Sequence, residues 1–253
     1  MKQAVLGFLL AVQFLSRLPV PVSCPWNKAT SRWALRNYPV VGIIIGLIIA
    51  GVMHILYPYL PLTMLALLIV SLWVWLTGGL HLDGWMDAAD AVGSNAPLEK
   101  KWKIMKDPHA GSFAVISLFF LLAWKTVFVY FLLGISVEAA SALLLITAFS
   151  RLTAVLLLLY IPSAKKEGLA WEWKKNLTSI DAGIAAVPVI GCFIFFPNLL
   201  LLIPAYAVFF FLYGFWIKRT FKGVNGDLAG ASIEGGELWG LAVLWIYFSF
   251  VTG

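Results

Sequence analysis

Three aspartates, Asp83, Asp87 and Asp90, stand directly after a long apolar stretch. On a helix their i, i+4, i+7 spacing places all three on one face, with Asp87 and Asp90 within about 40° of the direction of Asp83. Like charges at i, i+4 destabilise a helix by roughly 0.2–0.5 kcal/mol each, and a bound divalent cation would remove that repulsion. Oxygen ligands suit Mg²⁺ or Mn²⁺. The pattern predicts metal ligands; an acidic helix start that favours the helix dipole is the alternative, and it explains three aspartates less well.

A second group of acids lies in the glycine-rich stretch 223–237, which holds five glycines together with Asp227, Glu234 and Glu237. We expect this stretch to be a loop just outside a helix end. Asp227 is predicted to complete the metal site with the first cluster. Glu234 or Glu237 is predicted to serve as a base or to orient the ligands.

Two further candidates lie close to the first acidic cluster. His81 precedes Asp83 by two residues and is able to hydrogen-bond a phosphate or a carboxylate, although a lone histidine is more often structural. Lys106 and Asp107 precede an apolar run and are better functional candidates than Lys100 and Lys101, which fit an ordinary basic loop.

Lys125 and Arg151 fall near the middles of two apolar runs. An intramembrane charge costs at least about 2.5–3.5 kcal/mol on insertion scales, so each cation needs a partner. We expect no acid at the same depth. An anionic ligand or backbone carbonyls are therefore the predicted partners, with a purely structural role left open.

The composition defines the class of protein that positions these groups. The chain has 253 residues, of which 62% are hydrophobic and only 12% are charged, whereas soluble domains carry about 25% charge. It predicts an all-α, polytopic integral membrane bundle forming one membrane-embedded domain, 1–253. The net charge of +6 fits the excess of Lys and Arg in cytoplasmic loops, so no nucleic acid partner is indicated.

The predicted bundle has 6–7 transmembrane helices. The short N-terminal run, Ala4–Leu15, cannot span a bilayer and is expected to be an interfacial or half helix. A seventh run, Leu238–Val251, is short. The six longer runs are Tyr38–Tyr57, Leu62–Leu80, Ser112–Leu133, Glu138–Ile161, Ala182–Pro197 and Leu199–Ile217.

The distribution of Lys and Arg predicts the orientation of the chain in the membrane. Four connections hold nearly all the charges, and the alternate connections hold no Lys or Arg. Because cytoplasmic loops are enriched in Lys and Arg, the charged side is predicted to face the cytoplasm, from a cytoplasmic (inner) membrane. These four segments are Arg17–Asn37, His81–Gly111, Ser163–Asp181 and Lys218–Glu237.

The chain resembles the cobalamin synthase (adenosylcobinamide-GDP ribazoletransferase) family over its whole length. The combination of motifs in this order is highly specific, while the aspartate run alone would only be suggestive. The motifs are FLSRLPVP at 14–21, YPVVG at 38–42, GGLHLDGWMDAAD at 78–90, KIMKDPHAGSFAV at 103–115, Ser150-Arg151, and GDLAGASIEGGE at 226–237.

The resemblance implies a Mg²⁺-dependent phosphoryl transfer in cobalamin biosynthesis. Adenosylcobinamide-GDP and α-ribazole (or its 5′-phosphate) would be joined, giving adenosylcobalamin (or its phosphate) and GMP. On this reading the metal ligands are Asp83, Asp87, Asp90 and Asp227. The candidate phosphate-binding residues are Lys106, Arg17 and Arg151, and the candidate bases are Asp90, Asp107 and Glu234.

Two other functions would also place acids near a membrane surface or within a membrane. CDP-alcohol phosphotransferases also place aspartates at a membrane mouth, but after Asp83-Gly84 this chain lacks the Ala-Arg of their motif. A cation-coupled transporter would place carboxylates at mid-membrane depth beside broken helices. The sequence leaves open whether the chain forms a homo-oligomer in the lipid bilayer.

Overall fold

The computed structural model describes residues 2–250, and they form helices with no strand. This confirms the predicted all-α class. The helices are α1 (Lys2–Leu15), α2 (Lys28–Leu56), α3 (Leu62–Thr77), α4 (Leu80–Gly93), α5 (Leu98–Ile104), α6 (Ser112–Ile135), α7 (Val137–Ala140), α8 (Leu143–Tyr160), α9 (Leu169–Lys174), α10 (Ser179–Cys192), the short 3₁₀ helix η1 (Pro197–Leu199), α11 (Leu202–Phe221) and α12 (Gly226–Phe250).

Several helices are long and apolar enough to cross a membrane, so the protein is a multi-pass membrane protein. Within residues 2–250 four spans meet this description, namely α2, α6, α7–α8 and η1–α11, and a fifth results if α3 and α4 are one broken span. The predicted count of 6–7 is not confirmed. Helices α1 and α10, at 14 residues each, are shorter than the 20 or so residues that a bilayer requires.

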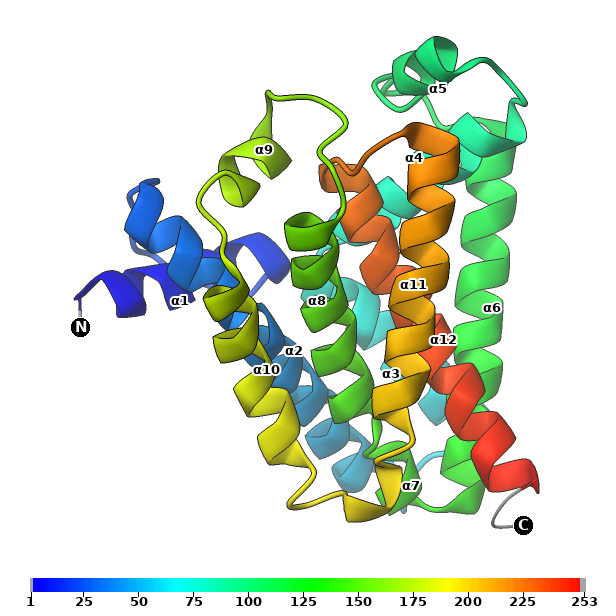
Figure 1. Ribbon diagram of the computed structural model, residues 1–253. Helices are drawn as coiled ribbons and strands as arrows, with labels where there is room; N and C mark the ends of the chain where they lie inside the picture. Colours follow the sequence, from blue (N-terminus) through cyan, green and yellow to red (C-terminus); the bar gives the residue numbers. More distant parts are fainter. Residues whose placement is uncertain (1, 251–253) are drawn as a thin grey trace.

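Helix α8 lies at the centre of the bundle, where it packs against α2, α10, α11 and α12 (Figure 1). The contact with α2 is close because Gly42 and Gly46 face Thr147 and Leu144. The hydroxyl of Thr147 also donates to the Gly42 carbonyl at 2.8 Å. Small residues and hydroxyl groups are the usual means by which helices associate in membranes.

A sharp turn separates α3 from α4. Gly78 and Gly79 have φ angles of 70° and 77°, in the left-handed region that glycine adopts without steric cost. The two helices are bent by 94° at this point. The predicted continuous run Leu62–Leu80 is therefore corrected to a helix that ends at Thr77, and the aspartates lie on a separate helix.

Helix α12 differs most from the sequence prediction, because it includes residues that were predicted to form a loop. The stretch expected to be a loop forms its first three turns, and the predicted seventh run is only its second half, with Val251 outside the described residues. The glycines serve close helix packing, because Gly236 faces Ser150 and Gly240 faces the Tyr206 hydroxyl.

The charged connections gather at one end of the bundle. Helices α5 and α9 lie at this end, while α7 and the C-terminal end of α12 lie at the other (Figure 1). Two loops are joined here by backbone hydrogen bonds: Ala164 donates to the Val224 carbonyl at 3.0 Å, and Val224 donates to the Pro162 carbonyl at 2.8 Å. Helix α1 packs against α2 beside the bundle, as expected of a half helix.

Candidate active site

The two predicted acidic segments meet at the contact between α4 and α12. A Cβ atom on Gly84 would lie 2.4 Å from the Asp227 carbonyl oxygen, so the two backbones touch. The negative charges of Asp83, Asp90 and Asp227 are all close enough to repel the carboxylate charge of Asp87, and Asp83 likewise repels Asp227. Acids that are far apart in the sequence are therefore neighbours at one mouth of the bundle.

Asp83 and Asp87 carry the features expected of free metal ligands. Asp83 is exposed and Asp87 is partly exposed. Among residues 2–250, neither carboxylate has a hydrogen-bond donor or a basic residue as its partner. Asp227 accepts one hydrogen bond, from the Asn225 side-chain amide at 2.8 Å.

Asp90 has a structural role that the sequence did not reveal. Its carboxylate accepts hydrogen bonds from the backbone N–H groups of Gly111, at 2.6 Å, and Ala114, at 2.8 Å. These groups are at the N-terminus of α6, where backbone donors lack helical partners and a negative charge is favourable. Asp90 thus caps a helix from a neighbouring helix.

We predict that Asp90→Ala destabilises the protein. Loss of an N-terminal helix cap costs about 0.5–2 kcal/mol. Thermal unfolding in detergent micelles, compared with Glu99→Ala on the exposed helix α5, measures the effect. Equal melting temperatures for the two variants would contradict the capping role.

The described residues do not form a complete metal site by themselves. Between residues 2 and 250, no three His, Cys, Asp or Glu side chains stand close enough together to hold an ion. The four carboxylates predicted as ligands are therefore not gathered around one point in the described structure, and their role as ligands stays a prediction. The residues still fit Mg²⁺, which is commonly held by one or two carboxylates, water and substrate phosphates.

Below the acidic cluster lies a buried network of two cations and two anions. The Lys125 ammonium group lies 2.5 Å from Glu234 and 2.6 Å from Glu237. Glu237 also accepts hydrogen bonds from Arg151 and, at 3.2 Å, from the Trp73 indole. Each charged side chain in this network is at most 3% exposed, and the network joins α3, α6, α8 and α12.

This network, together with the start of α12, corrects two predictions and bears on three proposed roles. The expectation that no acid lies at the depth of Lys125 and Arg151 is wrong. The expectation that Glu234 and Glu237 lie in a loop at the mouth is also wrong, because α12 begins eight residues before Glu234. Their paired, buried charges do not support Glu234 as a base, Glu237 as a ligand-binding group or Arg151 as a phosphate-binding group.

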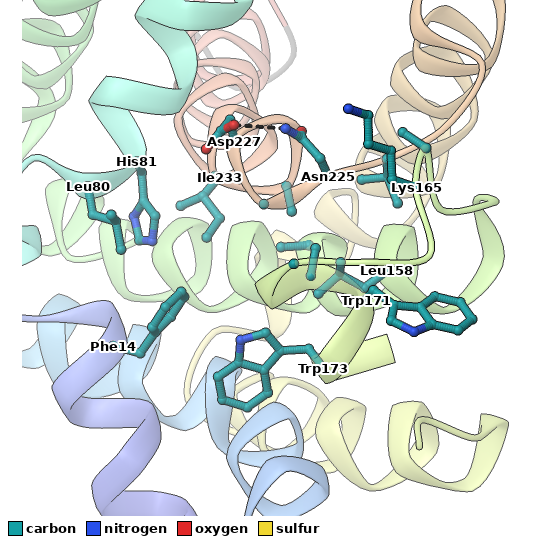
Figure 2. Close-up of a pocket in the computed structure, with 18 of the residues that line it drawn as sticks. Phe14, Leu80, His81, Leu158, Lys165, Trp171, Trp173, Asn225, Asp227 and Ile233 are labelled. Carbon is teal, nitrogen blue, oxygen red and sulfur yellow. Dashed lines mark hydrogen bonds between the residues drawn. The ribbon is translucent and has the colours of Figure 1, made fainter. Parts of the chain in front are cut away.

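A cavity of about 550 Å³ opens beside Asp227 at the same end of the bundle. It lies between α1, α2, α4, α8, α9 and the start of α12, and α5 contributes to its rim. Of the predicted site residues, His81, Lys106 and Asp227 line it. Figure 2 shows His81 on one side, Phe14 and Trp173 below, and Asn225 and Asp227 above.

Sequence reasoning missed several lining residues, chiefly those of the segment 163–178. Lys165, Trp171 and Trp173 come from this segment, and Asn225 precedes Asp227. Two tryptophans within a charged loop were an available signal, because such residues are typical of binding surfaces.

Asp107 and Arg17 do not line the cavity. Asp107 is exposed, and hydrogen bonds from the backbone and ring of His109 hold its pKa below the usual value, which weakens it as a base. Arg17 packs its side chain against Gly78, so it lies at the α3–α4 turn next to the acidic helix.

The fold and site define a polytopic helical membrane protein with an acidic cluster and an aromatic cavity at one mouth. The sequence model of the cobalamin-5-phosphate synthase family matches residues 7–245. The chain belongs to this family.

Curated relatives support the same assignment. An adenosylcobinamide-GDP ribazoletransferase of Halalkalibacterium halodurans is 34% identical over 260 residues, covering 100% of both chains. Proteins with the same name from a Geobacillus strain (WCH70) and from Thiobacillus denitrificans are 33% and 35% identical, covering 99% and 98% of each chain. No solved structure matches the chain.

Proposed function

We propose that this protein joins adenosylcobinamide-GDP to α-ribazole or its 5′-phosphate, releasing GMP. The observation that carries the proposal is the direct contact of Asp227 with the aspartate helix at Gly84. It brings acids from two distant segments together, and one of them, Asp227, also lines a cavity able to hold an organic substrate. Membership of the ribazoletransferase family supports the chemistry.

In the proposed reaction, a ribose hydroxyl oxygen attacks the phosphorus that is attached to cobinamide. The bond from that phosphorus to the bridging oxygen breaks, and GMP leaves with the bonding electrons. Such transfers depend mainly on positioning and on stabilising negative charge. Mg²⁺ would neutralise charge on the diphosphate and on the departing GMP.

Each remaining role is assigned from position. Asp83 and Asp87 would hold the metal, because both carboxylates are unpaired among the described residues. Lys106 and Lys165 line the cavity with exposed ammonium groups that suit phosphate oxygens. Asp227 would take the hydroxyl proton. It alone of the predicted acids both lines the cavity and lies close enough to Asp87 for their charges to repel.

We further propose that this mouth faces the cytoplasm from the inner membrane. The support is the excess of Lys and Arg in the connections at this end of the bundle. Single cysteines introduced at positions 95 and 170 are expected to react with an impermeant reagent only after the cells are opened; reaction in intact cells would reverse the orientation.

Purified protein in lipid nanodiscs tests the activity directly. We expect one GMP for each adenosylcobalamin formed from adenosylcobinamide-GDP and α-ribazole when Mg²⁺ is present. A CDP-alcohol donor should release no CMP. Release of CMP without release of GMP would favour the rival phosphotransferase instead.

Two features of the fold fit the transporter alternative. They are the break between α3 and α4 and the burial of Glu234 and Glu237. Both glutamates, however, are neutralised by Lys125 and Arg151. A transported cation would have to displace these partners. The paired network is better explained as a support that holds α12 in place.

We predict that Gly84→Ala lowers the rate of GMP release by roughly 100-fold, since a displacement of about 1 Å in a reacting group can cost that much. The added methyl group would push the Asp227 backbone away from α4. The matched control is Gly183→Ala on α10, where the methyl group meets open space. Equal rates for both variants would contradict the close contact.

A further inference from the structure

His81 is a buried polar group without a partner. Its side chain is 2% exposed, and neither ring nitrogen makes a hydrogen bond to any described residue. Buried polar groups in proteins are nearly always hydrogen-bonded, because leaving one unsatisfied costs free energy. In Figure 2 the ring projects into the cavity near Phe14, so a bound molecule is able to supply the missing partner.

His81 and the acidic cluster lie on different faces of α4. The two-residue step from His81 to Asp83 turns the helix by about 200°, so the side chains point in nearly opposite directions. Asp227 touches α4 at Gly84 and also lines the cavity. The cavity and the proposed diphosphate site therefore adjoin at Asp227.

Trp173 is a second unsatisfied donor on the cavity wall. It is 2% exposed, and its indole N–H has no partner among residues 2–250. Its ring lies 5.6 Å from Phe14 and 5.8 Å from Tyr38, both edge to face. The three rings form an aromatic wall from α9, α1 and α2, which is a surface suited to a flat, apolar ring.

The size and polarity of the cavity indicate which part of the two substrates it is able to hold. At about 550 Å³ it has the volume of a site for a drug-sized molecule, and a corrinoid with its side chains is far larger. Guanine needs several hydrogen-bonding partners on its edge. Of the polar side chains on the lining, Glu167 is exposed to solvent. The amide of Asn225 is already bonded to Asp227, and its carbonyl oxygen to the Leu228 backbone.

We propose that the cavity binds α-ribazole, a benzimidazole nucleoside, with its base against the aromatic wall and its ribose directed toward Asp227. The base has a single ring nitrogen free to accept a hydrogen bond, and the ribose hydroxyls both donate and accept. His81 and Trp173 match these needs, since a neutral histidine offers one donor and one acceptor. The proposal rests on the proposed function and names the position of one substrate within it.

Equilibrium binding of α-ribazole to protein in nanodiscs, without the second substrate, tests the proposal. We expect α-ribazole to bind and guanosine not to compete. His81→Phe and Trp173→Ala should each weaken binding on the order of tenfold or more, which corresponds to a lost hydrogen bond or stacking contact. Trp173→Phe, which keeps an aromatic ring, should weaken it less.

Two matched controls isolate the effect: His54→Phe, at an exposed position on α2, and Trp124→Phe, on the exposed face of α6. Both should bind α-ribazole as the unmodified protein does. Steady-state kinetics should show a raised KM for α-ribazole in His81→Leu, with the KM for adenosylcobinamide-GDP unchanged. His81→Leu also serves if His81→Phe fails to fold.

The outcomes separate this proposal from the proposed function. Active protein whose His81 and Trp173 variants bind α-ribazole normally would overturn the cavity assignment alone, as would displacement of α-ribazole by guanosine. Protein that binds α-ribazole through these residues but forms no GMP would support the cavity and overturn the proposed function.

Discussion

Asp83→Asn will reduce GMP release by at least about 100-fold while the protein remains folded in the membrane. Removing one preorganised charged group that stabilises a transition state costs about 10²–10³ in rate. The asparagine has nearly the same shape, and Asp83 is exposed without a described partner, so folding should not suffer. The measurement is initial GMP release at saturating Mg²⁺ and both substrates.

The matched control for this experiment is Glu99→Gln, which removes a negative charge from exposed helix α5 at the same end of the bundle. It should retain full activity. Equal activities for Asp83→Asn and Glu99→Gln would remove Asp83 from the metal site.

Glu237→Gln will destabilise the bundle by about 3–5 kcal/mol, the usual cost of removing one partner from a buried ion pair. The substitution leaves Lys125 and Arg151 with a single buried anion, Glu234. The measurement is unfolding by sodium dodecyl sulfate in mixed micelles, followed by tryptophan fluorescence. Glu138→Gln, at the opposite end of the bundle, should unfold at the concentration that unfolds the unmodified protein.

A double variant shows whether the cost arises from the unpaired charge. Glu237→Gln combined with Arg151→Met restores the balance of one buried cation and one buried anion. Its loss of stability should be smaller than the sum of the two single losses by about 0.5–3 kcal/mol, as for residues in one network. Strict additivity would contradict the coupling between these residues.

The membrane class, the helical character and the clustering of charges at one end could be predicted from composition and hydropathy alone. The aspartate helix could also be predicted, since the spacing of Asp83, Asp87 and Asp90 places them on one face. The approach of Asp227 to the aspartate helix α4 was predicted only from residue type. Its physical basis is Gly84, whose lack of a side chain lets the Asp227 backbone approach α4, and this contact becomes visible only in the three-dimensional structure.

Three features lay beyond sequence reasoning. Glycine is normally unfavourable within a helix, so the stretch 223–237 was read as a loop, whereas tight packing uses its glycines. Pairing Lys125 and Arg151 with acids required knowing that α12 begins at Gly226. The cap formed by Asp90 depends on how α4 meets α6, which no local pattern encodes.

The central claim is that Asp83 and Asp87, with Asp227 beside them, hold a divalent ion against a diphosphate at one mouth of the bundle. Electron paramagnetic resonance of Mn²⁺, titrated into nanodisc-embedded protein with adenosylcobinamide-GDP, tests it most directly. We predict one bound Mn²⁺ per chain, lost in Asp83→Asn and weakened in Asp227→Asn. Unchanged Mn²⁺ binding in both variants would contradict the account.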